Sequence, residues 1–392
     1  MRKAVFITVF GLWGFTVFVS AQAPTASPIW TVSPVDRSNV DYSQMPLWAY
    51  GVDETPKATD PQAVQGGPNA APPAPIPPAE ANRKRRLDGS DLSFTRLEIR
   101  GVVTDWYPAD HPNPMPRIIK LGPAALVLGE TGRACGGCHL SDGSGRPENA
   151  SPAGLQAKYI LRQLDDFRNG LRHSVEPGKG NSNTMVMLAK AMTEQEMKQA
   201  ADYFSAVTWR KHVTVIETER VPSTRIQGEL FIPKVNHVAE HKLTEPIGNR
   251  IIEVPTDVDA NQILRNSRGT WVAYVPMGAI ARGKNLVTTG GSEIVNGKIV
   301  LGRATACTTC HGQDLRGMAP DIPPLAGRSP SYLAREIFDI QQGTRAGSYQ
   351  LMPLMKKAVE KLTAEDIIDI TAYLASLPVD GPAPATLTLT QR

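Results

Sequence analysis

The fold of this 392-residue chain is decided by two short stretches, Cys135-Gly-Gly-Cys138-His139 and Cys307-Thr-Thr-Cys310-His311. In each stretch two thiols separated by two residues are followed at once by a histidine. This pattern accepts a c-type haem, because one helical turn brings both sulfurs to the vinyl groups and places the histidine under the iron. A zinc half-site or a thiol redox pair also uses Cys-x-x-Cys, but two copies with histidine and no other cysteine disfavour both.

The sequence around the first motif recurs around the second, which indicates two copies of one module. The motifs themselves repeat at a shift of 172 residues, the stretch that follows them at 173, and the end of each module at 170. The second shift relates Tyr159, Asp166, Gly170 and Arg172 to Tyr332, Asp339, Gly343 and Arg345, and the third relates Met185, Thr193 and Tyr203 to Met355, Thr363 and Tyr373.

Each module is predicted to end in a helix with a capped start. Thr193-Glu-Gln-Glu196 and Thr363-Ala-Glu-Asp366 both fit the capping pattern, in which a threonine and an acid three residues later satisfy free backbone amides. Apolar residues then follow at helical spacing, and Pro378 ends the second helix. Another helix is predicted to begin near Tyr159 and near Tyr332.

A sixth ligand of each iron must come from elsewhere in its module, and a methionine sulfur suits a reduced, softer iron. Met185 and Met355 are the candidates, because both stand at the same distance before their capping threonines, on what we expect to be the loop before the last helix. The alternatives that the sequence leaves open are Met187, Met192 and Met197 in the first module and Met352 in the second.

With these motifs the chain resembles the tandem two-haem class I cytochromes c, over roughly residues 130–209 and 277–378. The resemblance implies a mainly helical fold around each haem, two covalently bound haem c groups, His/Met ligation and electron transfer. In that family a proline carbonyl accepts a hydrogen bond from the haem histidine. Pro323 stands at this position in the second module, but Ala150 stands there in the first, so we expect a backbone carbonyl to serve in both.

The remaining sequence divides into segments of different composition. Arg2 and Lys3, an apolar run and Ala21 predict a signal peptide over 1–21, since the run is shorter than the roughly 20 residues of a membrane span. Between the modules, short β-branched runs punctuated by prolines predict an irregular β linker over 210–276. The other predicted segments are a Pro-rich, disordered extension over 22–88 that includes a docked stretch around Trp30 and Trp48, a loop segment over 89–129 packed on the first module (130–209), and a tail over 379–392 after the second module (277–378).

Composition and export narrow the function. The net charge of +4 and the lone basic run over 83–86 give no reason to expect nucleic acid, and no membrane anchor is expected after signal cleavage. We therefore expect a periplasmic electron carrier between a dehydrogenase and a terminal oxidase or another cytochrome, or the cytochrome subunit of such a dehydrogenase. The alternative is a haem enzyme, peroxidase-like or sulfur-oxidising, which would leave one iron without a methionine.

The motifs predict two haems that cannot be extracted. Acid-acetone treatment should leave the colour with the protein, because thioether bonds survive it, and the mass of the mature chain should exceed the polypeptide mass by two haems. A single added haem, or colour in the organic phase, would contradict the interpretation of both motifs.

Overall fold

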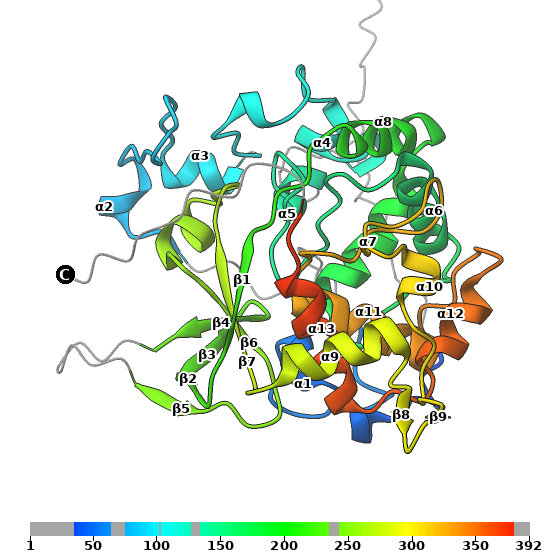
Figure 1. The fold of residues 1–392 in the computed structure, drawn as a ribbon. Coiled ribbons are helices and arrows are strands. Elements are labelled where there is room, and N and C mark those ends of the chain that lie inside the picture. Colours follow the sequence, from blue (N-terminus) through cyan, green and yellow to red (C-terminus); the bar gives the residue numbers. More distant parts are fainter. Residues whose placement is uncertain (1–34, 64–74, 102, 127–133, 235–242, 380–392) are drawn as a thin grey trace, which may run out of the picture. The chain divides into compact units, whose positions relative to one another are not determined.

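The computed structural model describes residues 35–63, 75–101, 103–126, 134–234 and 243–379. Two helical modules and a β segment between them make up most of these residues (Figure 1). The predicted signal peptide, Trp30 and nearly all of the predicted tail lie outside the described residues. No helix within the described ranges is long and apolar enough to cross a membrane.

The two modules repeat the same helices around their motifs. The backbone amide of Gly145 donates to the carbonyl of His139 at 3.0 Å, and Gly317 donates to His311 at 2.9 Å. Gly154 likewise binds Phe204, and Gly327 binds Leu374. The mainly α fold of two repeated modules is therefore confirmed. Its helices are α5 (Cys135–His139), α6 (Ala157–Arg168), α7 (Gly180–Ala191) and α8 (Glu194–Ser205) in the first module, and α9 (Ala279–Thr289), α10 (Thr308–His311), α11 (Pro330–Gln342), α12 (Met352–Val359) and α13 (Ala364–Ser376) in the second.

The last helix of each module begins at the threonine that the sequence predicts. Thr193 and Thr363 each accept a hydrogen bond from the amide three residues on, and the acid at that position binds back to the threonine amide. Both capping boxes are thus confirmed. Helix α13 packs along α9 and α11, and its apolar face carries Ile367, Ile370 and Leu374 into the core of the second module.

The β segment between the modules is small and irregular, as predicted. Its central sheet has the order β1-β7-β6, with β1 parallel and β6 antiparallel to β7. Two-stranded pairs β3-β4 and β2-β5 lie beside it, and a hairpin, β8-β9, is inserted in the second module. The strands are β1 (Val213–Glu217), β2 (Arg220–Pro222), β3 (Thr224–Gln227), β4 (Leu230–Pro233), β5 (Thr244–Pro246), β6 (Ile252–Pro255), β7 (Trp271–Val275), β8 (Glu293–Val295) and β9 (Lys298–Val300), with a π-helical turn over Asp259–Ile263.

The docked stretch that the sequence predicts around Trp48, within the N-terminal extension, is present in the structure. Helix α1 (Leu47–Tyr50) buries Trp48 and Tyr50 in the core of the second module, and the Tyr50 hydroxyl donates to Asp339 at 2.8 Å. Arg37 donates to the carbonyl of Ser174 in the first module at 2.9 Å. A few aromatic side chains can bury enough surface to fix a segment that is otherwise poor in apolar residues, which explains how this stretch docks within a Pro-rich extension.

The segment before the first motif forms short helices. Ile118 and Ile119 of α4 share a buried core with Tyr159 and Phe204 of the first module. Trp106 is 1% exposed, and its indole nitrogen donates to the carbonyl of Leu264 at 2.6 Å. In the described residues before α5 the helices are, in chain order, η1 (Tyr42–Gln44), α1, α2 (Pro78–Ala81), α3 (Arg96–Gly101), η2 (Pro108–Asp110), α4 (Arg117–Leu121) and η3 (Ala124–Leu126).

Replacement of Trp48 tests the docking of the N-terminal segment. Trp48→Ala should lower the free energy of unfolding by about 3–5 kcal/mol, because it leaves a cavity between α1 and the second module. Denaturant unfolding of the holoprotein measures this loss. Leu97→Ala, at a position that is 51% exposed, is the control and should change little. Equal stability of both variants would show that the segment does not dock.

Candidate haem centres

The first motif forms the short helix α5, and its histidine is held by the backbone. His139 Nδ1 donates to the carbonyl of Ala150 at 2.8 Å, and Phe204 of α8 packs edge-on against the ring with 6.0 Å between centroids. The hydrogen bond fixes the ring and leaves Nε2 free to bind a metal. The expected carbonyl contact is therefore present although alanine replaces proline.

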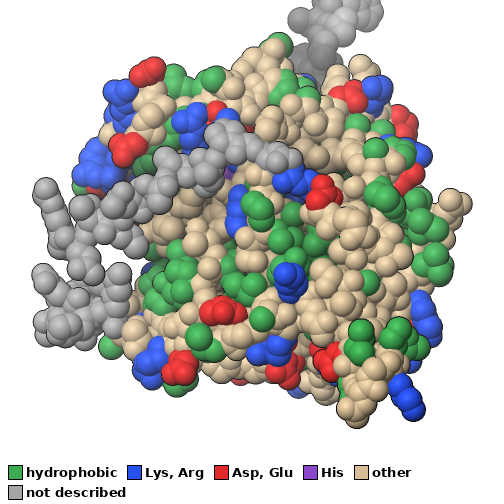
Figure 2. Space-filling view, in the orientation of Figure 1, with side chains coloured by type: hydrophobic (Ala, Val, Ile, Leu, Met, Phe, Trp, Pro, Cys, Tyr) green, Lys and Arg blue, Asp and Glu red, His purple; other side chains and the backbone are tan. Residues whose placement is uncertain are grey.

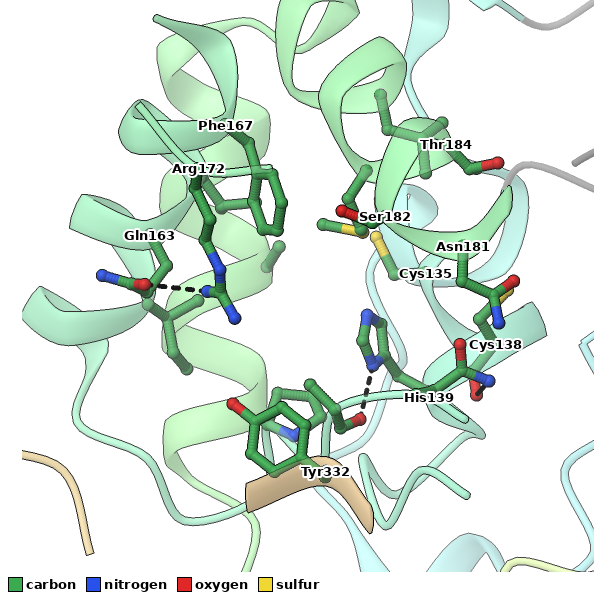
Figure 3. A pocket seen from close by; sticks show the side chains of 18 of the residues that line it. Cys135, Cys138, His139, Gln163, Phe167, Arg172, Asn181, Ser182, Thr184 and Tyr332 are labelled. Atoms are coloured by element: carbon green, nitrogen blue, oxygen red, sulfur yellow. Dashed lines mark hydrogen bonds between the residues drawn. The ribbon is translucent and has the colours of Figure 1, made fainter. Parts of the chain in front are cut away.

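A largely apolar cavity opens beside this motif (Figure 3). Cys135 and His139 stand on one side of the cavity, and Phe167 and Arg172 stand across from them. A flat, largely hydrophobic macrocycle with charged propionates fits a cavity whose lining is mostly apolar but includes several charged and polar side chains. The apolar lining includes Leu155, Ile160, Leu164, Phe167, Leu188, Met192 and Phe204, and the polar lining includes Arg172, Lys179, Asn181, Arg335 and Glu336.

Met185 is one of two methionines that line the first cavity. It lines the cavity together with His139, whereas the alternative Met187 is buried outside the lining. Met192 also lines the cavity, and Met197 is buried in the module core. The expectation of a loop position is wrong, because Met185 lies within α7. The Asn181-Ser-Asn183 start of that helix resembles a loop in sequence, which hid the helix.

The second motif repeats this arrangement. His311 is buried, and its Nδ1 donates to the carbonyl of Pro323 at 2.9 Å, as expected. Cys307 packs against the core of the second module, as do Met352 and Met355. Both methionines lie on helix α12, so Met355 also stands on a helix and not on the expected loop. The packing of the second module does not distinguish between them.

The modules meet in a cluster of charged side chains that are largely withdrawn from solvent. Glu336 of α11 accepts from Arg172 at 2.8 Å, and it also binds Arg345. Both arginines donate to the side-chain oxygen of Gln163, at 2.8 and 3.0 Å, and Arg345 donates to the Tyr159 hydroxyl at 2.9 Å. Arg172 and Arg345 are repeat partners, and so are Gln163 and Glu336. The contact is therefore symmetric except that one position carries an amide and the other a carboxylate.

This cluster sets the charge state of Glu336. Burial alone would raise the pKa of Glu336, but the guanidinium groups of Arg172 and Arg345 together outweigh burial and lower it. Asp339 on the same helix has no such pair of cations. Burial dominates there and raises the pKa of Asp339 to about 7, although the amide of Val175 donates to the carboxylate. The pKa values of two carboxyl groups about one helical turn apart are thus shifted in opposite directions.

Comparison with known proteins agrees with the two modules. The cytochrome c family model matches residues 130–208 and 294–378. Cytochrome c-554(548) of Halomonas halodenitrificans is 41% identical over 70 residues, which are 18% of this chain and 82% of that protein. The chain belongs to the cytochrome c family. It carries two covalently bound haem c groups and is a dihaem electron-transfer protein.

Two further relatives align with different shares of this cytochrome. The thiosulfate dehydrogenase electron acceptor of Stutzerimonas stutzeri is 23% identical over 246 residues, 62% of this chain and 79% of that protein. Cytochrome c4 of Azotobacter vinelandii is 34% identical over 79 residues, 19% of this chain. The match covers only 38% of that cytochrome c4.

Sequence reasoning missed the residues that the second module contributes to the first cavity. Tyr332, Arg335, Glu336 and Asp339 of α11 all line it. A signal was available, since Tyr332 and Asp339 belong to the repeated positions. Repetition alone, however, does not reveal that equivalent residues of two copies face each other.

The contact between the modules should make the free energy of unfolding decrease as the pH falls. The lowered pKa of Glu336 means that its carboxylate stabilises the folded state above its ordinary pKa of 4.5 and that this contribution is lost as pH falls below that value. Denaturant unfolding from pH 6 to pH 3 measures the loss. Glu336→Gln should lack this component and should cost roughly 3–5 kcal/mol at neutral pH, because two arginines stay buried with one partner removed. Parallel curves for both proteins would show that Glu336 is not the group involved.

Proposed function

We propose that this cytochrome is a periplasmic electron carrier in which His139 and Met185 bind one iron and His311 and Met355 bind the other. The observation that carries the proposal is the position of Met185, which lines the same cavity as His139. If Met185 and the backbone-fixed imidazole of His139 both held the iron, no position on it would remain for a substrate. Haem iron supplies the one-electron couple, and the chain supplies a fixed, apolar surrounding that keeps water away from it.

The proposed electron donor is a dehydrogenase in the same compartment, and the proposed acceptor is a terminal oxidase or another cytochrome. The thiosulfate dehydrogenase electron acceptor, which aligns with 62% of this chain, supports a dehydrogenase as the donor. The signal peptide predicted over residues 1–21 supports export. We further propose that residues 130–209 and 277–378 are the two haem domains, joined through the β segment of residues 210–276.

Ligation by sulfur is tested by removing one methionine at a time. Met185→Ala and Met355→Ala should each remove about half of the weak far-red band that iron–thioether ligation gives to the oxidised protein, and each should lower one reduction potential. Absorption spectra and an anaerobic redox titration record both effects.

The matched controls are Met187→Ala and Met352→Ala, which should leave the band intact. If a control removes the band instead, the ligand assignment in that module is wrong. Rapid binding of cyanide or carbon monoxide by the unaltered protein would contradict the carrier function itself.

A further inference from the structure

The two modules differ in how much protein covers the outer side of their motifs. Positions 172 residues apart are equivalent here, as the matched hydrogen bonds of Gly145 and Gly317 show. Cys138 is partly buried, whereas its counterpart Cys310 is exposed. The difference continues after the histidine, where Ser141 and Asp142 are buried and their counterparts Gln313 and Asp314 are exposed.

Two segments outside the repeat cover the first motif. A Cβ atom on Gly136 would lie 2.6 Å from a methyl group of Val103 and 3.2 Å from the carbonyl of Ile119, so the chain before the motif packs directly on α5. From the other side, the guanidinium of Arg265 donates to the carbonyl of Gly137. Both contacts cover this edge of the first motif with other parts of the chain.

The loop after the first motif is covered in the same way. Tyr203 donates to the carbonyl of Ser141 at 2.7 Å, and the ring of His111 packs on Tyr203 with 5.7 Å between centroids. His111 is held by Asp105 at 2.9 Å. Residues 103–122 and 257–271 together therefore close the side of the first module from which Cys138 would otherwise be reached.

The equivalent side of the second module is open and apolar. Met318, which follows the second motif, is 46% exposed, and Leu354, next to Met355 on α12, is 63% exposed. The hairpin β8-β9 rises just before Cys307, since its base packs Gly290 against Ala304 and Ala306. Figure 2 shows hydrophobic side chains at the lower right, with basic and acidic ones beside them, where Figure 1 draws this hairpin. On the hairpin Ile294, Ile299 and Leu301 are 76%, 73% and 83% exposed.

Basic side chains accompany these apolar ones. Lys298 and Glu293 are both exposed on the hairpin, whereas Lys356, Lys357 and Lys361 are exposed on and just after α12. Glu360 is the acid among these three lysines, and the hydrogen bond from Lys357 is the first of the contacts that lower the pKa of Glu360. If Met355 binds the second iron, α10 and α12 flank the same haem, and Lys356 and Lys357 are exposed on one of these two helices.

We propose that this cytochrome exchanges electrons with its protein partners at one face only, the exposed side of the second motif with α12 and the hairpin β8-β9. The partner is a redox protein whose contact surface has an apolar centre and an acidic rim. The proposal rests on the proposed function as an electron carrier. In this proposal the cytochrome accepts electrons and delivers them at the same face. Transfer of electrons from one partner to another through both modules would need an exposed edge on the first module as well.

Charge reversal on this face tests the proposal with small redox reagents. Lys298→Glu and Lys357→Glu together should slow oxidation by the anion hexacyanoferrate(III) roughly 3- to 10-fold at about 10 mM ionic strength, and most of the effect should vanish at about 0.3 M. The same variant should be oxidised faster by the cation tris(phenanthroline)cobalt(III). Lys120→Glu, on α4 beside the first motif, should leave both rates unchanged. An equal effect of Lys120→Glu, or no effect of the lysine pair, would overturn the single face.

The apolar centre is tested with an acidic blue-copper protein as the oxidant. Ile294→Ser and Leu354→Ser together should slow that reaction at least about 3-fold, because each removes exposed apolar surface from the contact. Oxidation by hexacyanoferrate(III) should not change, and Leu97→Ser is the exposed control on α3. An unchanged blue-copper rate would overturn the apolar docking. An equilibrium redox titration of every variant should still show two haems, which separates failure of the face from failure of the carrier function.

Discussion

One carboxylate shared by two arginines joins the halves of this protein. Glu336 is a partner of both Arg172 and Arg345, and its side chain is only 15% exposed. A buried ion pair is weak evidence for stability in itself, because desolvation offsets the attraction, but removal of one member leaves an unpaired charge. The cluster therefore restricts how the two modules pack, because Glu336, Arg172 and Arg345 must all contact one another. The residues of α11 that line the first haem cavity depend on this packing.

Duplication produced two similar modules, and the segments outside the repeat made them different. Residues 103–122 and the chain around Arg265 close the outer side of the first motif, whereas the N-terminal segment docks on α11 and leaves the second motif open. The modules also differ at their contact, where Gln163 faces Glu336. The two haem sites thus have similar local folds but different surroundings. The difference comes mainly from segments outside the repeated modules, which a comparison of the two modules would not include.

The motifs, the repeat and the capped helices could be predicted from sequence because each is a local pattern. Thr193 and Thr363 mark helix starts through contacts that span three residues, and His139 is recognised by its neighbours. The position of Met185 on a helix was missed, because Asn181, Ser182 and Asn183 favour turns when read alone. A docked stretch around Trp48 was predicted, but its partners on α11 were not, and neither was the approach of Glu336 to the first cavity, because both depend on contacts between residues far apart in the chain. No periodicity within a segment encodes such contacts.

The N-terminal segment also has a consequence for the order of assembly. Tyr50 and Asp339 meet across 289 residues of chain, and contacts of such sequence separation form late in folding. A loop of that length carries an entropic cost before the contact can contribute to stability. The docking of Trp48 and Tyr50 therefore ties one of the first described segments of the chain to a helix near its last described residues.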